Sequence, residues 1–63
     1  MQEMIGEFTG SKLRDKRFKS LLTQGELAER IGVSRITVNK WETGNATPSM
    51  KHLRSLKRLL KEK

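Results

Sequence analysis

The chain contains no cysteine, one proline, one histidine and only seven acidic residues against fourteen basic ones. Without cysteine there are no disulfides and no thiolate metal sites, which fits a reducing compartment. His52 has no cysteine or second histidine near it, so we expect no metal and no cofactor. No apolar run reaches the roughly 18–20 residues of a membrane span. Residues 1–10 also lack the basic start and apolar block of a signal peptide.

Catalytic groupings are absent as well. Asp15, Glu26 and Glu29 fall on predicted helices and have no partner suited to acid–base chemistry. No nucleophile is paired with a base, and no glycine-rich phosphate loop occurs, so we predict that the protein is not an enzyme.

The sequence has an excess of positive charge. With 63 residues the chain predicts a single domain, and its formal net charge is +7 with a pI near 10.4. A strongly basic small domain favours a polyanionic partner, because cations placed near phosphates release condensed counterions. Nucleic acid is the first candidate and an anionic membrane surface the second.

The pattern of apolar residues divides the chain into an arm and a helical domain. In residues 1–10, Met4, Ile5 and Phe8 recur at helical spacing between glycines, which predicts an arm that folds back on residues 11–63. Ser11 is the expected N-cap of the first helix. The inward positions of that helix are predicted to be Leu13, Arg17 and Leu21, with Phe18 and Leu22 beside them.

Two short helices follow, with a sharp turn between them. Thr23 and Glu26 form the T-x-x-E pattern of a capping box, which predicts a helix over 24–31 ended by Gly32. Ser34 caps a helix over 35–43 that Gly44 ends. The predicted inward positions of these two helices are Leu27, Ala28, Ile31, Val38 and Trp41.

The last helix is predicted to start at the Thr47-Pro48 pair and to run to the end of the chain. Its inward face is predicted to carry Met50, Leu53, Leu56 and Leu59 or Leu60, with lysines and arginines on the opposite faces. No strand pattern is present, so the predicted fold class is all-α.

The helix, tight turn and helix carry the functional signal. A small residue at Ala28 lets two helices cross closely, and Gly32 supplies the positive φ of the turn. A helix projected in this way fits the major groove of B-DNA, which is about 12 Å wide.

Leu22 to Gly44 reads L-T-Q-G-E-L-A-E-R-I-G-V-S-R-I-T-V-N-K-W-E-T-G and resembles the helix-turn-helix of phage repressor and Cro proteins, the XRE family. The resemblance extends back to Leu13-Arg14-x-x-Arg17 and forward to Thr47-Pro48-Ser49-Met50 and Leu53-x-x-Leu56. It covers most of residues 11–60 and implies a lambda-repressor-like compact bundle of four or five short helices.

The resemblance also implies residue roles. DNA base contacts are assigned to Ser34, Arg35, Ile36, Asn39 and Lys40. DNA backbone contacts are assigned to Thr23, Gln24, Arg14, Thr37, Thr43 and Asn45. Arg35 would bond guanine O6 and N7, worth about 1–3 kcal/mol against a wrong base, and Ile36 would meet a thymine methyl. Arg17 and Glu42 match a structural salt bridge between two helices.

Three functional hypotheses follow. The first is sequence-specific binding of double-stranded DNA by a cytoplasmic, nucleoid-associated transcriptional repressor, which forms a homodimer on a pseudo-palindromic site and does not bind membrane. The second is an antitoxin or adaptor that uses the same fold for protein interaction. It is motivated by the apolar arm and by the end of the chain at Lys63, before the fifth helix with which the family builds its dimer. The third is membrane-surface binding by the basic amphipathic helix within residues 47–63.

Overall fold

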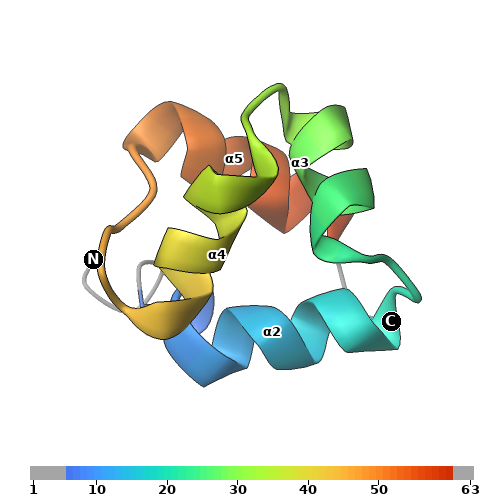
Figure 1. The fold of residues 1–63 in the computed structure, drawn as a ribbon, viewed down its shortest axis with the longest axis horizontal. Helices are drawn as coiled ribbons and strands as arrows, with labels where there is room; N and C mark the ends of the chain where they lie inside the picture. Colours follow the sequence, from blue (N-terminus) through green and yellow to red (C-terminus); the bar gives the residue numbers. More distant parts are fainter. Residues whose placement is uncertain (1–5, 61–63) are drawn as a thin grey trace.

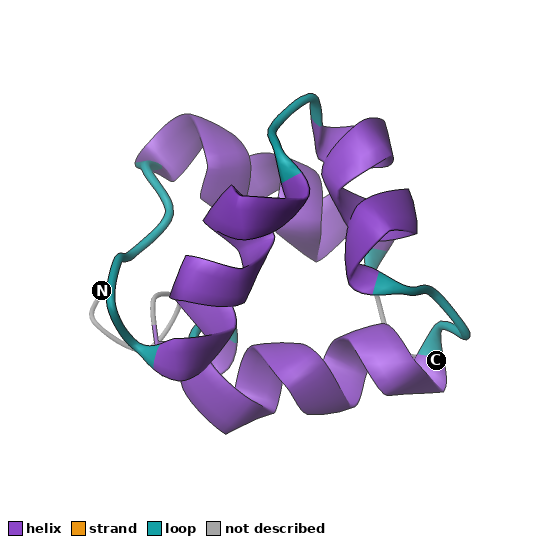
Figure 2. Cartoon of the chain, in the orientation of Figure 1, coloured by secondary structure: helices purple, strands orange, loops and turns teal. Residues whose placement is uncertain are grey.

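The computed structural model describes residues 6–60, and within them every regular element is a helix (Figure 2). The four complete helices are α2 (Gly10–Lys19), α3 (Gln24–Ile31), α4 (Arg35–Thr43) and α5 (Met50–Leu59). Gly6 and Glu7 are helical too. The fold class is therefore the predicted one, and α3 and α4 have the predicted bounds.

The helices enclose one core. In Figure 1, α2 lies across the lower side, α4 packs against both α2 and α3, and α5 passes behind α3 and α4. The core is built from all four helices and from the segment before α2. Its buried residues are Phe8, Leu13, Leu27, Ala28, Val38, Trp41, Leu53, Leu56 and Leu60. Most of them were predicted from helical periodicity, since one stripe of each amphipathic helix must leave water.

The start of the domain differs from the prediction. The N-cap of α2 is Thr9 and its first residue is Gly10, so the helix begins before the expected cap at Ser11. Phe8 is buried in the core, with the Lys16 Nζ atom 5.5 Å from the centre of its ring. Burial of this aromatic ring packs the segment before α2 onto the domain, which is the fold-back predicted for Phe8. Met4 and Ile5 lie outside the described residues.

The end of α2 also departs from the expected pattern. Leu21 was predicted to face inward, but it is 89% exposed and has a φ of 60°. Its amide donates to the Phe18 carbonyl, and the Leu22 amide donates to the Arg17 carbonyl. This is the hydrogen-bond pattern of a Schellman motif, with leucine in the left-handed position that glycine usually takes. The reversal of the chain turns Leu21 outward and brings Leu22 against the core.

The last helix starts later than the sequence suggested. Its N-cap is Ser49, whose hydroxyl accepts from the His52 amide, so Thr47 and Pro48 are not its cap and first residue. Met50 was predicted to face inward, but as the first residue of α5 it is 55% exposed. The inner face consists of Leu53 and Leu56, followed by Leu60 at the C-cap. None of the helices within residues 6–60 is long and apolar enough to span a bilayer.

Candidate nucleic-acid interface

The N-terminus of α3 is closed by side chains. The Thr23 Oγ1 atom accepts from the Glu26 amide at 3.0 Å, and the Glu26 Oε1 atom accepts from the Thr23 amide at 2.8 Å. These reciprocal bonds form the capping box expected from the sequence. The Thr23 oxygen acts as an acceptor in the box, so its hydroxyl proton is still able to point toward a phosphate.

The turn between α3 and α4 depends on two small residues. Gly32 has a φ of 93°, and its amide and that of Val33 both donate to the Ala28 carbonyl, at 2.8 and 3.0 Å. Ala28 itself is 3% exposed, in the pair of helices that pack most extensively on each other. A larger side chain at Ala28 would push the helices apart, and a side chain at Gly32 would strain the turn.

The turn leaves one face of α4 exposed. Val38 and Trp41 face the core, whereas the expected base-contacting residues on the helix and at its cap are all exposed: Ser34, Arg35, Ile36, Asn39 and Lys40. Residues three and four apart lie on the same side of a helix, so Ile36, Asn39 and Lys40 share one face. Ile36 is 63% exposed among polar neighbours. The face thus offers two cations, an amide and an apolar side chain to a ligand.

The N-cap of α4 engages the hydroxyl groups of Ser34 and Thr37. The Ser34 Oγ atom accepts from the Thr37 amide at 3.2 Å and lies 3.0 Å from the Thr37 hydroxyl. Ser34 is therefore a structural cap in the free protein, and Thr37 is half-buried against it. A contact from either hydroxyl to DNA would have to coexist with these bonds.

Two candidate backbone contacts lie at the C-terminal end of α4. The Thr43 hydroxyl donates to the carbonyl oxygens of its own helix, at 3.0 Å from Asn39 and 3.3 Å from Lys40. The Asn45 amide nitrogen donates to the Thr43 hydroxyl at 3.1 Å. Asn45 keeps a second amide proton for a phosphate, whereas the Thr43 hydroxyl is directed into the helix.

A buried network connects three helices beneath this face. The Arg17 Nε atom lies 2.6 Å from Glu42 Oε2, and a second guanidinium nitrogen lies 3.1 Å from Oε1. The two side chains are only 8% and 3% exposed. Arg17 also donates to the Leu22 carbonyl at 2.9 Å, so this salt bridge, expected from the resemblance, also fixes the end of α2.

Gln24 belongs to the same network, which the sequence did not indicate. Its Nε2 atom donates to Glu42 Oε1 at 3.0 Å, across 18 residues of sequence. This bond holds the first side chain of α3 in one orientation, next to the amides of the helix N-terminus, where anions bind well. No local pattern signals such a pair, because the two residues meet only through the crossing of α3 and α4.

The remaining candidate, Arg14, stands apart from the others. It is exposed on α2 and makes no hydrogen bond or ion pair with the α4 residues in the described part of the chain. The structure therefore brings the α3 and α4 candidates together but does not link Arg14 to them. Within residues 6–60 no group of three or more His, Cys, Asp or Glu side chains could hold a metal ion.

The comparisons with known proteins agree with this geometry. A model of the helix-turn-helix family matches residues 13–63. The HTH-type transcriptional activator BcrR of Enterococcus faecalis is 42% identical over 45 residues, which cover 71% of this chain and 22% of the relative. This chain therefore corresponds to about a fifth of that relative's length. No solved structure gives a significant match.

The family match covers α3, its glycine turn and α4, the elements that expose the polar face described above. The chain therefore belongs to the Cro/C1-type (XRE) helix-turn-helix family of DNA-binding transcription regulators.

Proposed function

We propose that the domain binds a specific sequence of double-stranded DNA, with α4 in the major groove and the N-terminus of α3 against the phosphate backbone. The observation that carries this proposal is the exposed face of α4, where Arg35, Ile36 and Lys40 stand free of the core on a helix capped at both ends. The groove of B-DNA, about 12 Å wide, admits such a helix.

The proposed contacts divide into two kinds. Arg35 and Lys40 donate to guanine, Asn39 bonds adenine, and Ile36 packs on a thymine methyl. Gln24 and Asn45 donate to phosphates, with Thr23, Thr37 and Arg14 as further backbone contacts. Thr43 joins them when its hydroxyl turns away from the Asn39 and Lys40 carbonyls. Backbone contacts set the position of the domain, whereas base contacts select the sequence.

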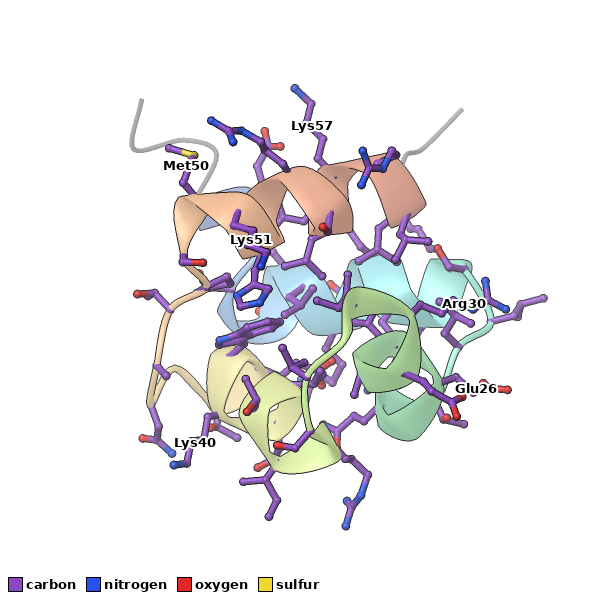
Figure 3. All side chains as sticks on the ribbon, turned by 90° about the horizontal axis from the view of Figure 1, so that it is seen from above. Glu26, Arg30, Lys40, Met50, Lys51 and Lys57 are labelled. Carbon is purple, nitrogen blue, oxygen red and sulfur yellow. The ribbon has the colours of Figure 1, made fainter. Side chains whose placement is uncertain are left out.

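Substitutions distinguish these two kinds of contact. Arg35→Ala is expected to reduce the preference for the selected site by about 5- to 150-fold, since a bidentate base contact is worth about 1–3 kcal/mol. Gln24→Ala should weaken binding to all duplexes alike. Arg30→Ala is the matched control, because Arg30 is an exposed arginine that projects from α3 well away from Lys40 (Figure 3).

The test is a selection from random duplexes, followed by titration of the selected site and of a scrambled one. Affinity should fall as salt rises, and each phosphate neutralised by a lysine or arginine contributes about −0.9 to the slope of log K against log salt. A symmetric selected site would support the proposed homodimer, because a two-fold axis in the protein requires one in the DNA. Equal affinity for selected and scrambled duplexes would refute sequence-specific binding.

We further propose that the domain represses transcription by occupying its site, as a non-enzymatic protein of the cytoplasm, where it meets the nucleoid. Repression by occupancy requires only the DNA-binding face, whereas activation requires a second contact with the transcription machinery. The relative named above is an activator, so the direction is tested with a reporter gene placed behind the selected site. A rise in reporter output on expression would overturn the repressor assignment.

Two observations weaken the other two hypotheses, namely the antitoxin or adaptor role and binding to a membrane surface. Phe8, one of three apolar residues proposed to bind a partner through the arm, is buried in the core. The apolar face of α5 is buried as well, with Leu53 and Leu56 at 1% and 0% exposure. An amphipathic helix binds a bilayer through that face, so folded α5 has none to insert.

A further inference from the structure

The outer face of α5 is strongly basic. Lys51, Arg54, Lys57 and Arg58 are all exposed, and α5 contains no acidic residue. Within residues 6–60 none of these four side chains forms a salt bridge or a hydrogen bond to another side chain. We call these four residues the α5 basic face. Their charges are free to interact with an external anion.

At Lys57, this face points away from the proposed DNA-binding face. In Figure 3 Lys57 projects from α5 on one side of the molecule, and Lys40 projects from α4 on the other. The exposed surface of α4 contributes only Arg35 and Lys40 to the positive charge. The recognition helix α4 thus carries two exposed basic residues, whereas α5 carries four. The proposed function does not use the four basic residues of α5.

We propose that the α5 basic face is a second phosphate-binding surface, which takes a second DNA duplex while α4 occupies the groove of the first. A helix rises 1.5 Å per residue, so Lys51 and Arg58 are separated by about 10 Å along α5. One DNA strand presents a phosphate every 3.4 Å along its axis, so about three phosphates face that length. Long, flexible side chains reach them without sequence-specific geometry.

DNA fits this surface better than a membrane does. Leu53, Leu56 and Leu60, the residues that an interfacial helix would insert, are at most 2% exposed. A bilayer that approached α5 would therefore meet charge and, of the large apolar side chains of Met50–Leu59, only Met50 fully exposed. A duplex requires charge alone and presents it at uniform spacing. Where one domain is already bound, neighbouring DNA is also present at high local concentration.

The experiment measures whether the full chain joins two duplexes. Beads carry a duplex with the selected site, and a labelled duplex of unrelated sequence is added with and without protein. The test variant K51Q/R54Q/K57Q/R58Q removes the charge, and K51R/R54K/K57R/R58K retains it. Circular dichroism verifies that both variants are folded, which is expected because all four residues are exposed.

The intact chain and the charge-retaining variant are expected to capture the labelled duplex, and capture should fall as salt rises, with a slope of about −3 for the three phosphates that face the helix. The neutral variant should still bind the bead duplex with unchanged sequence preference, yet capture at least tenfold less of the second.

Three results would overturn the proposal. The first is equal capture by the neutral variant. The second is capture that depends on Arg35 and Lys40 instead, which would mean bridging through two recognition helices. The third is binding of the intact chain to anionic vesicles without capture of a second duplex. Retention of the protein on the bead duplex is recorded separately, so failure of the primary DNA-binding function is distinguishable from failure of bridging.

Discussion

Removal of one partner of the Arg17–Glu42 pair should destabilise the domain severely. Glu42→Ala leaves the Arg17 guanidinium buried without its carboxylate, since the arginine side chain is 8% exposed and the glutamate 3%. Loss of one partner of a buried pair costs about 3–5 kcal/mol. A domain of 63 residues has a free energy of unfolding of only about 3–9 kcal/mol, so the substitution removes a large share of the total.

Replacement of both partners should be much milder. The double variant R17M/E42L fills the space with apolar side chains and leaves no buried charge. Such replacements are often neutral or stabilising by about 1–4 kcal/mol relative to the ion pair. The double variant also removes the Arg17 donor to the Leu22 carbonyl and the Glu42 acceptor of the Gln24 amide. The loss of these two hydrogen bonds offsets part of the stabilisation. We therefore expect the double variant to be more stable than either single variant.

Urea unfolding measures these differences. Trp41 is the single tryptophan and is 3% exposed, so its fluorescence reports on the core, and circular dichroism reports on the helices. At about 4–8 °C per kcal/mol, Glu42→Ala should lower Tm by more than about 12 °C. A loss below 1 kcal/mol for Glu42→Ala would refute the argument. So would a double variant whose loss is the sum of the single losses, because the two side chains would then act independently.

Four further substitutions test local features of the fold. Leu21→Gly should raise the free energy of unfolding by about 0.5–1 kcal/mol, since it relieves a left-handed leucine, while Gly32→Ala at a φ of 93° should lower it by about 1–2 kcal/mol. Both are measured in urea, and a stabilised Gly32→Ala would contradict the assigned turn. Thr23→Ala should cost about 1 kcal/mol through loss of the capping box, and an unchanged midpoint would exclude that role for the threonine. Ala28→Leu should cost about 1–3 kcal/mol and weaken binding to the selected duplex by displacing α4 from α3, whereas full affinity would show that the helix spacing does not matter.

The sequence alone determined the helices whose ends have their own chemical signals. Thr23 and Glu26 with Gly32 set the bounds of α3, and Ser34 with Gly44 set those of α4, because caps and left-handed glycines act over three or four residues. Leu27 and Ala28 of α3, Val38 and Trp41 of α4, and Leu53 and Leu56 of α5 were readable for a similar reason, since burial repeats with the helical period. The outward position of Arg35, Ile36, Asn39 and Lys40 on α4 followed from the same periodicity.

Only the tertiary structure decided the burial and orientation of residues at the places where helices end or meet. Leu21 matches the apolar stripe of α2, yet it lies outside, because the helix ends at Lys19 and the chain reverses. Phe8 is buried together with core residues of all four helices, and Ser49 rather than Thr47 caps α5. Gln24 acquires its orientation from Glu42, 18 residues away, because the crossing of α3 and α4 brings the two together. Local rules concern neighbours within about one helical turn, whereas these outcomes depend on contacts between distant segments.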